Sequence, residues 1–558
     1  MKTKLLLILV LQLALGAIQA QTLLKDIETT PANGSSSPSN WCAVSDALFI
    51  FEATNLIQVN YLFASDGTEA GTIGLGSYLI DTDIIRLGNR AFFGGCDITL
   101  SADSCASLYV SDGTVAGTGF FFDLDPSGLS LGITDIVAGD SLFFFGGHTI
   151  DNGYELWRSN GTVEGTYMVM DIATGSESGY AGELAVVDDI AYFAAYTEEE
   201  GIEPWRSDGS ASGTYMIVDL NAGLDDSFPM YFTSSGGYIY FSGLEEGSGN
   251  EVRRTNGMQG NVELIGEGDG TTDSSNPRDF VDSDGTLYYV AEGDDVAGYD
   301  LFVYNHTGEP THLDFNENDI FPRALMPFGD GEVIFNAVND SGRELWRSDG
   351  TLEGTVMITD LYPGENDGVF GTGTVGGSFY VCMDSVVYFA GADGINAAGE
   401  FVYELFKSDG TAAGTELVSD HVPGTEGANP GEFFEFRTRI YFAATTPATG
   451  REPFYIEKGI PTTNEDLNLV HRNDARLYPN PVLSGNQITI ELSLPAKSNL
   501  QTEVFDLAGR SVLPAISHGS FDKGNCKISI SMSEVPAGFY TLTVRLESEL
   551  LSFPLVVQ

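Results

Sequence analysis

Basic residues are scarce in this sequence. Its 558 residues include 25 Lys and Arg against 80 Asp and Glu, which gives a formal net charge of −55. Because proteins hold nucleic-acid phosphates through Lys and Arg, this balance excludes a nucleic-acid partner. It disfavours anionic membranes for the same reason, and it is typical of a soluble surface that attracts cations.

Cysteine and histidine are scarce as well. Five cysteines are too few for a disulfide scaffold. Cys96 and Cys105 bracket one short loop that an exported protein could close with a disulfide, and this pairing stays open. The six histidines form no short-spaced pair, and no G-x-S-x-G elbow is present. We therefore expect no zinc site, no catalytic serine of that type and no cofactor, with calcium as the one alternative.

The candidate for calcium is the segment LDFNENDI. Asp314, Asn316 and Asn318 repeat the alternating oxygen ligands that open a calcium loop. The pattern then fails, because its sixth position is Asp319 instead of Gly and no Glu stands at the twelfth. A solvated acidic turn is the interpretation that we favour.

Long apolar runs are absent apart from one at the N-terminus. In residues 1–20, Lys2 and Lys4 precede an apolar stretch that ends at Ala20. This is the pattern of a secretory signal peptide, and the run is short for a membrane span. We expect cleavage after Ala20, no transmembrane segment in the mature chain and, since no Cys follows, no lipoprotein anchor.

A repeated phrase dominates the rest of the chain. ELWRSDGTLEGT at 344–355 repeats ELWRSNGTVEGT at 155–166 with two changes. A degraded copy, DLFVYNHTGEPT, lies at 300–311, and a last copy, EPFYIEKG, begins at Glu452. Nine units result, most of them 46 to 48 residues apart, as the turn glycines show: Gly67, Gly113, Gly161, Gly209, Gly257, Gly350 and Gly410.

Each unit has the pattern of four short strands. Unit four predicts strands at 183–187, 190–195, 203–207 and 214–220, separated by turn residues such as Asp-Gly. No window shows a sustained helical period. A four-stranded sheet of about 48 residues, repeated many times, indicates a β-propeller.

The two ends of the repeat region complement each other. TLLKDI, near residue 22, looks like a fourth strand without its hairpin, and the last phrase lacks a fourth strand. One blade can thus be completed from both ends, which hides the edges that an open array would expose. We predict an all-β chain with a single propeller of eight to nine blades over residues 21–460.

These phrases resemble the ELWxxDGT repeats of secreted proteins from Bacteroidetes-type bacteria. SDGTVAGT, SNGTVEGT, SDGTLEGT and SDGTAAGT, led by ELW or ELF, carry the resemblance over roughly residues 22 to 459. The resemblance implies a propeller-like fold and no established activity.

The pattern changes after the repeats. Residues 461–476 are expected to be a linker, and 477–558 a small β-sandwich. The latter resembles the type A C-terminal sorting domain of the type IX secretion system. The resemblance rests on the motif residues Tyr478, Pro479, Asn480, Pro481, Asp506, Leu507, Ala508, Gly509, Pro536, Ala537, Gly538, Phe539 and Tyr540.

The resemblance implies an address for the protein. It implies passage through the periplasm and across the outer membrane by the type IX machinery, to the cell surface or the medium. One departure is that such domains usually finish with a basic residue, whereas this chain ends LLSFPLVVQ. Attachment or cleavage is therefore in question, but the address is not.

The repeated side chains are expected to serve the fold. An active site needs one asymmetric set of groups, whereas one Glu and one Trp or Phe recur at a fixed place in most units. We expect the rings to fill the space between sheets, and the Arg of the phrase to lie on the surface. The recurring residues are Glu155, Glu203, Glu251, Glu344, Glu404 and Glu452, and Trp157, Trp205, Trp346, Phe406 and Phe454.

The units that break the pattern are the candidates for recognition. Units five and six lose the turn, and unit five carries Arg253 and Arg254, which we take as candidate ligand-binding residues, although repeat decay explains them equally well. We predict an exported, non-enzymatic binding or structural protein with a glycan or protein ligand and no catalytic residues. The alternative is an extracellular polysaccharide hydrolase or lyase, with two carboxyls about 5 to 10 Å apart at the propeller centre.

Overall fold

The structure is a computed structural model, and it divides into two compact parts, Met1–Lys458 and Gly459–Gln558. We call these parts the first unit and the second unit. Units with a number, such as unit four, are the sequence repeats in chain order. Among the described residues the chain is all β, with one short 3-10 turn at Ala211–Gly213 and no α-helix. The described residues are 21–29, 34–54, 60–97, 107–127, 130–266, 274–293, 298–313, 320–364, 366–369, 380–383, 385–396, 401–419, 427–457, 476–478, 487–494, 498–506, 511–521, 524–532, 535–536, 538–545 and 550–557.

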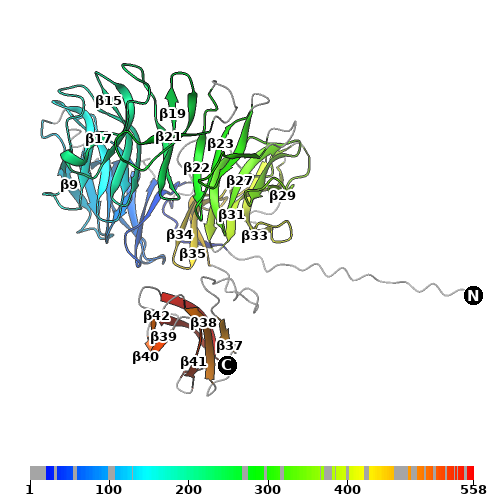
Figure 1. The fold of residues 1–558 in the computed structure, drawn as a ribbon. Helices are drawn as coiled ribbons and strands as arrows, with labels where there is room; N and C mark the ends of the chain where they lie inside the picture. The colour runs from blue at the N-terminus through cyan, green and yellow to red at the C-terminus, as the bar shows by residue number, and fades with distance from the viewer. Residues whose placement is uncertain are drawn as a thin grey trace, which may run out of the picture. The chain divides into compact units, whose positions relative to one another are not determined.

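The first unit is built from nine successive groups of four antiparallel strands (Figure 1). The first two groups share one sheet, because β5 pairs with β4 and then with β7. The groups are β2(Ser39–Ala43), β3(Phe49–Thr54), β4(Asn60–Ser65), β5(Ile73–Ile80); β6(Ile85–Leu87), β7(Arg90–Asp97), β8(Ser107–Ser111), β9(Gly119–Asp123); β10(Ile133–Ala138), β11(Phe143–Thr149), β12(Gly153–Ser159), β13(Tyr167–Met168); β14(Tyr180–Val187), β15(Ile190–Thr197), β16(Gly201–Ser207), β17(Tyr215–Met216); β18(Met230–Ser235), β19(Tyr238–Glu245), β20(Gly249–Thr255), β21(Val262–Gly266); β22(Arg278–Ser283), β23(Thr286–Glu292), β24(Tyr299–Tyr304), β25(Thr311–Leu313); β26(Arg323–Gly329), β27(Glu332–Asn339), β28(Gly342–Ser348), β29(Val356–Thr359); β30(Tyr380–Met383), β31(Val386–Ile395), β32(Phe401–Ser408), β33(Glu416–Ser419); and β34(Gly431–Phe436), β35(Arg439–Thr446), β36(Gly450–Glu457) with β1(Thr22–Leu23).

The repeated phrase forms the third strand of its group and the turn that follows, as predicted. The fourth strand is shorter than the sequence suggests: in unit four it covers only Tyr215–Met216 instead of 214–220. The reason is that the chain leaves the sheet early. The backbone N–H of Leu220 already donates to the carboxylate of Glu203, 2.8 Å away.

The N-terminal strand completes the last group. β1 pairs with β36, with Thr22 opposite Tyr455 and Leu23 opposite Phe454. The first strands of successive groups contact one another in chain order from β2 to β34, and β34 in turn contacts β2. The blue and yellow ends of this unit accordingly lie side by side in Figure 1.

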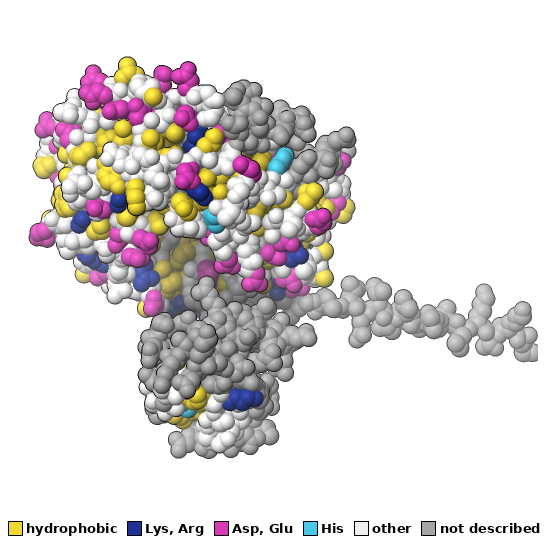
Figure 2. Space-filling model, in the orientation of Figure 1, with side chains coloured by type: hydrophobic (Ala, Val, Ile, Leu, Met, Phe, Trp, Pro, Cys, Tyr) yellow, Lys and Arg dark blue, Asp and Glu magenta, His cyan; other side chains and the backbone are white. Residues whose placement is uncertain are grey.

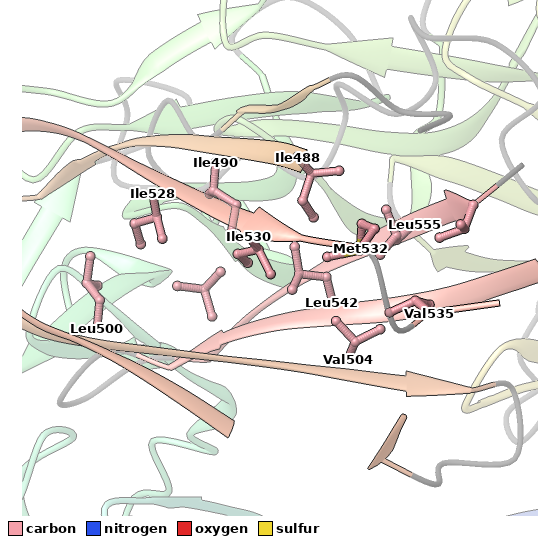
Figure 3. Close-up of a cluster of buried hydrophobic side chains, with 12 residues drawn as sticks. Ile488, Ile490, Leu500, Val504, Ile528, Ile530, Met532, Val535, Leu542 and Leu555 are labelled. Atoms are coloured by element: carbon pink, nitrogen blue, oxygen red, sulfur yellow. The ribbon is translucent and has the colours of Figure 1, made fainter. Parts of the chain in front are cut away.

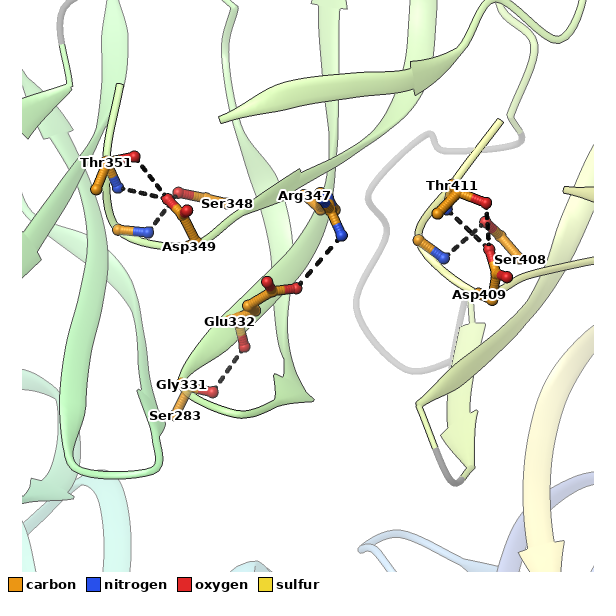
Figure 4. Close-up of polar contacts among 12 residues, drawn as sticks. Ser283, Gly331, Glu332, Arg347, Ser348, Asp349, Thr351, Ser408, Asp409 and Thr411 are labelled. Carbon is orange, nitrogen blue, oxygen red and sulfur yellow. Dashed lines mark hydrogen bonds and ion pairs between the residues drawn. The ribbon is translucent and has the colours of Figure 1, made fainter. Parts of the chain in front are cut away.

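The Asp-Gly turn of the phrase is held by a small network that recurs in six units. Figure 4 shows it at Asp349 and at Asp409. In unit seven the Asp349 carboxylate accepts from the backbone N–H and the hydroxyl of Thr351, at 2.9 and 2.7 Å. Gly350 has a φ of +85°, which favours glycine. Gly354 is needed for space, because a Cβ there would lie 2.0 Å from the Asp349 carboxylate.

We expect Gly354→Ala to lower the free energy of unfolding by roughly 1–3 kcal/mol, since the added methyl must displace the turn carboxylate. Denaturant unfolding followed by tryptophan fluorescence measures the change. Gly119→Ala is the matched control, because a Cβ at Gly119 meets nothing within 4 Å. Equal stability of the two variants would show that the second glycine has no steric role.

The cores of the first unit lie between neighbouring sheets, as expected for the repeated aromatic residues. Trp157 packs with Phe92, Phe143 and Phe145, so its cluster contains side chains from the second and third groups. Its indole N–H donates to the Gly147 carbonyl at 3.2 Å. The predicted packing role of this ring is therefore confirmed.

The second unit has its own core. β37(Arg476–Tyr478), β38(Gln487–Leu494) and β41(Gly524–Ser531) form one sheet, and β40(Ser511–Phe521), β39(Ser498–Asp506), β42(Gly538–Arg545) and β43(Leu550–Val557) form another. Buried aliphatic side chains from both sheets make one cluster (Figure 3), whose members are Ile488, Ile490, Leu500, Val504, Ile528, Ile530, Met532, Val535, Leu542, Val544, Leu555 and Val557.

Candidate functional site

The repeated glutamates are buried anchors for the loops that join successive sheets. Glu155 has no exposed surface, and its carboxylate accepts from the backbone N–H groups of Ile172, Ala173 and Gly179 at 3.0–3.2 Å. The other five register positions are equally buried and bind the matching loop: Glu203, Glu251, Glu344, Glu404 and Glu452. These carboxylates face the chain itself and are not available to a ligand.

Burial changes the protonation of these carboxyls. Desolvation raises the pKa of Glu155, Glu203 and Glu452 to about 7 and that of Glu344 to about 8, although backbone N–H donors favour the charged form. The pKa of an unfolded Glu is about 4.3. The folded protein therefore binds more protons than the unfolded chain between these values.

We expect the protein to become more stable as the pH falls from about 8 to about 5.5. The contribution of these raised-pKa groups is complete below about pH 4.3 and is lost as the pH rises through 7 to 8. Thermal unfolding in about 0.5 M NaCl measures the effect, because salt screens repulsion among surface carboxylates but not buried ones. A denaturation midpoint that stays constant or falls over this interval would contradict the assignment.

The Arg of the phrase is not simply a surface residue, which corrects the expectation from the sequence. Arg158 is half-buried and donates to the Gly209 carbonyl in the next unit's turn, at 3.5 Å. Arg439, which begins the second strand β35 and is not part of the phrase, donates in the same way to the Gly67 carbonyl. The sheets are too close together to leave these side chains free, and the turn carbonyls of the neighbouring unit are the acceptors within reach.

Arg253 and Arg254 both have partners inside their own region of the fold. Arg253 is 2% exposed and stands opposite Phe241, the place that Trp occupies in the two preceding sheets. Its guanidinium pairs with Glu245 at 2.8 Å. Arg254 pairs with Glu263 at 2.7 Å and stacks on a tyrosine ring. A ligand-binding role for the two arginines stays a prediction, and these contacts explain them without a ligand.

A serine, a histidine and an aspartate meet where the phrase is broken. Ser235 donates its hydroxyl proton to Asp282, and its Oγ lies 3.4 Å from Nε2 of His306. That Nε2 is 2.6 Å from the Gly285 carbonyl, which only accepts, so Nε2 carries the proton. Nδ1 then accepts from the Tyr240 hydroxyl at 2.8 Å. Because Nε2 cannot accept a proton from Ser235, this group is not a nucleophile with its base.

His306 also explains how the broken turn works. Tyr304 pairs with Leu287 near the start of β23, as Ser348 pairs with Val333 near the start of β27. His306 follows Tyr304 by two residues, as Gly350 follows Ser348. His306 therefore occupies the position that the turn glycine has in unit seven. It adopts a φ of +62°, and its ring reaches the preceding sheet. The sequence shows the loss of the turn but not this replacement contact.

The asymmetric surface groups lie instead on the first strands, through which successive sheets meet. Seven first strands carry a bulge near their start, and one residue of each bulge has a left-handed backbone. These bulge residues differ from sheet to sheet: Asn40, Asp135, Glu183, Tyr231, Asp279, Ala324 and Glu432. We call this set the bulge row, and it is our candidate functional site.

Carboxylates and one tyrosine dominate the bulge row. Asp135 accepts from the Tyr180 hydroxyl at 2.8 Å, and Glu183 accepts from the backbone N–H of Tyr231 at 3.3 Å. Burial raises the pKa of Asp279, although the charges of Arg278 and Arg323 lower it. The sequence signal for this row is a recurring x-Pro just before the first strand, as in SSPSN, SFPMY, SNPRD, IFPRA and ANPGE.

Several predicted site residues lie outside the described part of the chain. They are Cys105, the calcium candidates Asp314, Asn316 and Asn318, and the sorting-motif residues Pro479, Asn480, Pro481, Leu507, Ala508, Gly509 and Ala537. Cys96 is disulfide-bonded, and its pairing with Cys105 stays a prediction. Among the described residues, His, Cys, Asp and Glu form no group of three that could hold a metal.

The described sorting-motif residues, apart from Pro536, lie on strands of the second unit. Asp506 on β39 stands opposite Tyr540 on β42, and the Tyr540 hydroxyl donates to the Pro536 carbonyl at 2.9 Å. Gly538 begins β42, and Tyr478 ends β37. Asp506, Gly538 and Tyr540, distant in sequence, are thus brought together on one sheet.

The outer surface of the first unit agrees with the composition. On the face shown in Figure 2, Asp and Glu are spread among scattered Lys and Arg. No helix in the described residues is long and apolar enough to cross a membrane.

Solved structures resemble the chain only distantly. A puromycin hydrolase is 11% identical with a TM-score of 0.33, over 65% of this chain and 59% of that one. A puromycin-hydrolyzing peptidase of Mycobacterium tuberculosis is 13% identical (TM-score 0.35, 82% and 57%), and a virginiamycin B lyase from Staphylococcus aureus is 14% identical (TM-score 0.29, 57% and 93%). The chain thus spans less than two thirds of the puromycin hydrolase and of the puromycin-hydrolyzing peptidase, and no curated protein matches it.

The second unit has a clear counterpart among known families. Residues 476–558 match the family model of the secretion system C-terminal sorting domain. This match covers the strands from β37 to β43 and includes the motif residues described above. The chain therefore carries, at its C-terminus, a sorting domain of the type IX secretion system.

Proposed function

We propose that this protein is an exported β-propeller that binds a ligand at the cell surface or in the medium and is not an enzyme. One observation carries this proposal: the polar side chains that recur in the units are bound by the chain itself. The buried glutamates hold backbone N–H groups, and the turn aspartates hold their own turns. What varies from sheet to sheet is the bulge row, and variation on a constant scaffold suits recognition.

The proposal includes closure of the nine groups into a ring. Support comes from three contacts between the ends: β1 pairs with β36, β34 lies against β2, and Arg439 donates to the Gly67 carbonyl. Phe49 and Phe51 of the first group also share a buried cluster with Phe436 and Tyr441 of the last. For the second unit, the single core between its two sheets favours the predicted β-sandwich.

The carboxylates of the bulge row favour one alternative, a polysaccharide hydrolase or lyase. Asp279 is partly buried with a raised pKa, whereas Glu183 is exposed, and such a difference suits an acid and a base. Incubating the mature protein with neutral and acidic polysaccharides and assaying new reducing ends and unsaturated products separates the two proposals. We expect no product. Product that disappears in both Asp279→Asn and Glu183→Gln would overturn the binding-only function.

A further inference from the structure

The residue before the proline that precedes the first strand has the same left-handed backbone in five units and is exposed in four of them. Ser37, Phe228, Asn276, Phe321 and Asn429 have φ between +42° and +49° and precede Pro38, Pro229, Pro277, Pro322 and Pro430. The fold therefore demands a left-handed residue at this place. Asn tolerates that conformation, and a bulky aromatic residue is disfavoured in it.

Two of these five residues are phenylalanines that the fold does not need. Phe228 is 52% exposed and Phe321 is 37% exposed, so neither ring completes a core. The equivalent places in other units hold Ser or Asn with the same backbone. Asn could adopt this left-handed backbone with less strain than Phe. The exposed rings of Phe228 and Phe321 therefore indicate a role other than folding.

The bulge row supplies further groups beside these rings. Tyr231, three residues after Phe228, is 38% exposed and also left-handed. Asp279 lies on the next first strand, close enough to Tyr231 for its charge to raise the pKa of that phenol, although desolvation by burial is the larger cause. Arg323, exposed on the first strand after that, lowers the pKa of Asp279.

The Asp279 carboxylate has capacity left for a ligand. Within the described chain, no side chain or backbone N–H donates a hydrogen bond to the Asp279 carboxylate. Its pKa is affected by burial and by the charges of Arg278 and Arg323. By contrast, Asn276 donates to Glu292 and to the Ser274 carbonyl, so it is held in place between the two phenylalanine positions.

We propose that Phe228, Tyr231 and Phe321, with Asp279 and Arg323, bind a neutral oligosaccharide across units five to seven. This rests on the proposed binding function and names its ligand. Sugar rings offer apolar C–H faces to aromatic rings and hydroxyls to a carboxylate and a guanidinium. The first strands of neighbouring groups contact one another, so the two phenylalanines, two groups apart, suit a chain of several sugars.

The arrangement favours a glycan over a protein partner. The aromatic residues are interrupted by Asn276 and Asp279 and do not form one apolar patch, which the centre of a protein interface needs. The formal net charge of −55 disfavours polyanionic glycans, so the ligand is expected to be uncharged.

The test is isothermal titration of the mature full-length protein with linear hexasaccharides of β-1,4-glucose, α-1,4-glucose, β-1,4-mannose and β-1,4-xylose, and with an oligogalacturonate. We expect at least one neutral probe to bind, and Phe228→Asn and Phe321→Asn each to weaken it about tenfold. Neither variant should lower the denaturation midpoint, because Asn already occupies the same place in two units. Phe120→Asn is the control, since Phe120 is 58% exposed but lies on a fourth strand.

Each outcome decides the proposal. Weakened binding in both variants at unchanged stability, with Phe120→Asn like the wild type, supports it. Unchanged affinity in the Phe228→Asn, Phe321→Asn double variant overturns the site and leaves the binding function standing. Three results would overturn the ligand class. They are that no neutral probe binds, that the oligogalacturonate binds more tightly than the neutral probes, or that a protein partner still binds the double variant.

Discussion

Cells that produce the chain without residues 476–558 are expected to show no protein at the surface or in the medium. The match of these residues to a secretion system C-terminal sorting domain is the reason. The N-terminal segment should still carry the truncated chain across the inner membrane. Cell fractionation and surface proteolysis should therefore find it in the periplasm.

A point substitution and a folding assay serve as controls for that result. Protease resistance of the periplasmic truncated protein shows that the first unit has folded, so its retention is not misfolding. Tyr540→Ala removes the hydrogen bond to the Pro536 carbonyl and should lower export without abolishing it. Normal surface appearance of the truncated chain would show that the sorting domain is not the address.

Glu452→Ala is expected to lower the free energy of unfolding of the first unit by about 3–5 kcal/mol. The Glu452 carboxylate is completely buried and accepts from the backbone N–H groups of Ile27 and Ser36, both at 3.1 Å, and from the Ser36 hydroxyl at 2.6 Å. Its removal leaves buried donors without a partner and loosens the N-terminal segment from β36. Denaturant unfolding of the mature protein measures the loss.

Glu353→Ala is the control for Glu452→Ala. Glu353 belongs to a repeated phrase but is exposed in its turn, so its substitution should stay within about 0.5 kcal/mol of the wild type. Equal and small effects of both substitutions would mean that the buried register of glutamates does not hold the sheets together.

The strands and turns of the first unit were predictable because they depend on local sequence. Alternating apolar residues and Asp-Gly turns act within one unit, and repetition makes the pattern visible many times over. The pairing of β1 with β36 was predictable as well. The N-terminal end has a fourth strand without its hairpin, and the last repeat lacks a fourth strand.

The roles of individual polar side chains were less predictable, because they depend on contacts between units. A Glu in a strand pattern does not show that Glu155 will face a loop 17 to 24 residues further on. The Arg158 side chain has an acceptor only because the next sheet packs beside it. The same holds for His306, whose partners are Tyr240 on another strand and Gly285 in another turn.

In the broken units, the sequence draws attention to two arginines, whose ligand-binding role stays a prediction. Arg253 and Arg254 stand out in the sequence because they interrupt an aromatic pattern, yet both have carboxylate partners nearby. Phe228 and Phe321 look like ordinary core residues in the sequence. Only their exposure and left-handed backbones distinguish them.

The central proposal is that the two ends of the repeat region close its nine groups of strands into one ring, and a disulfide between the ends tests it most directly. Thr22 stands opposite Tyr455, and both side chains are at least partly exposed. In Thr22→Cys, Tyr455→Cys mature protein, mild oxidation should give a monomer that migrates faster on a non-reducing gel and unfolds at a higher temperature, whereas neither single variant should change. Failure of the double variant to cross-link within the monomer, or cross-linking only between two molecules, would contradict the closed ring.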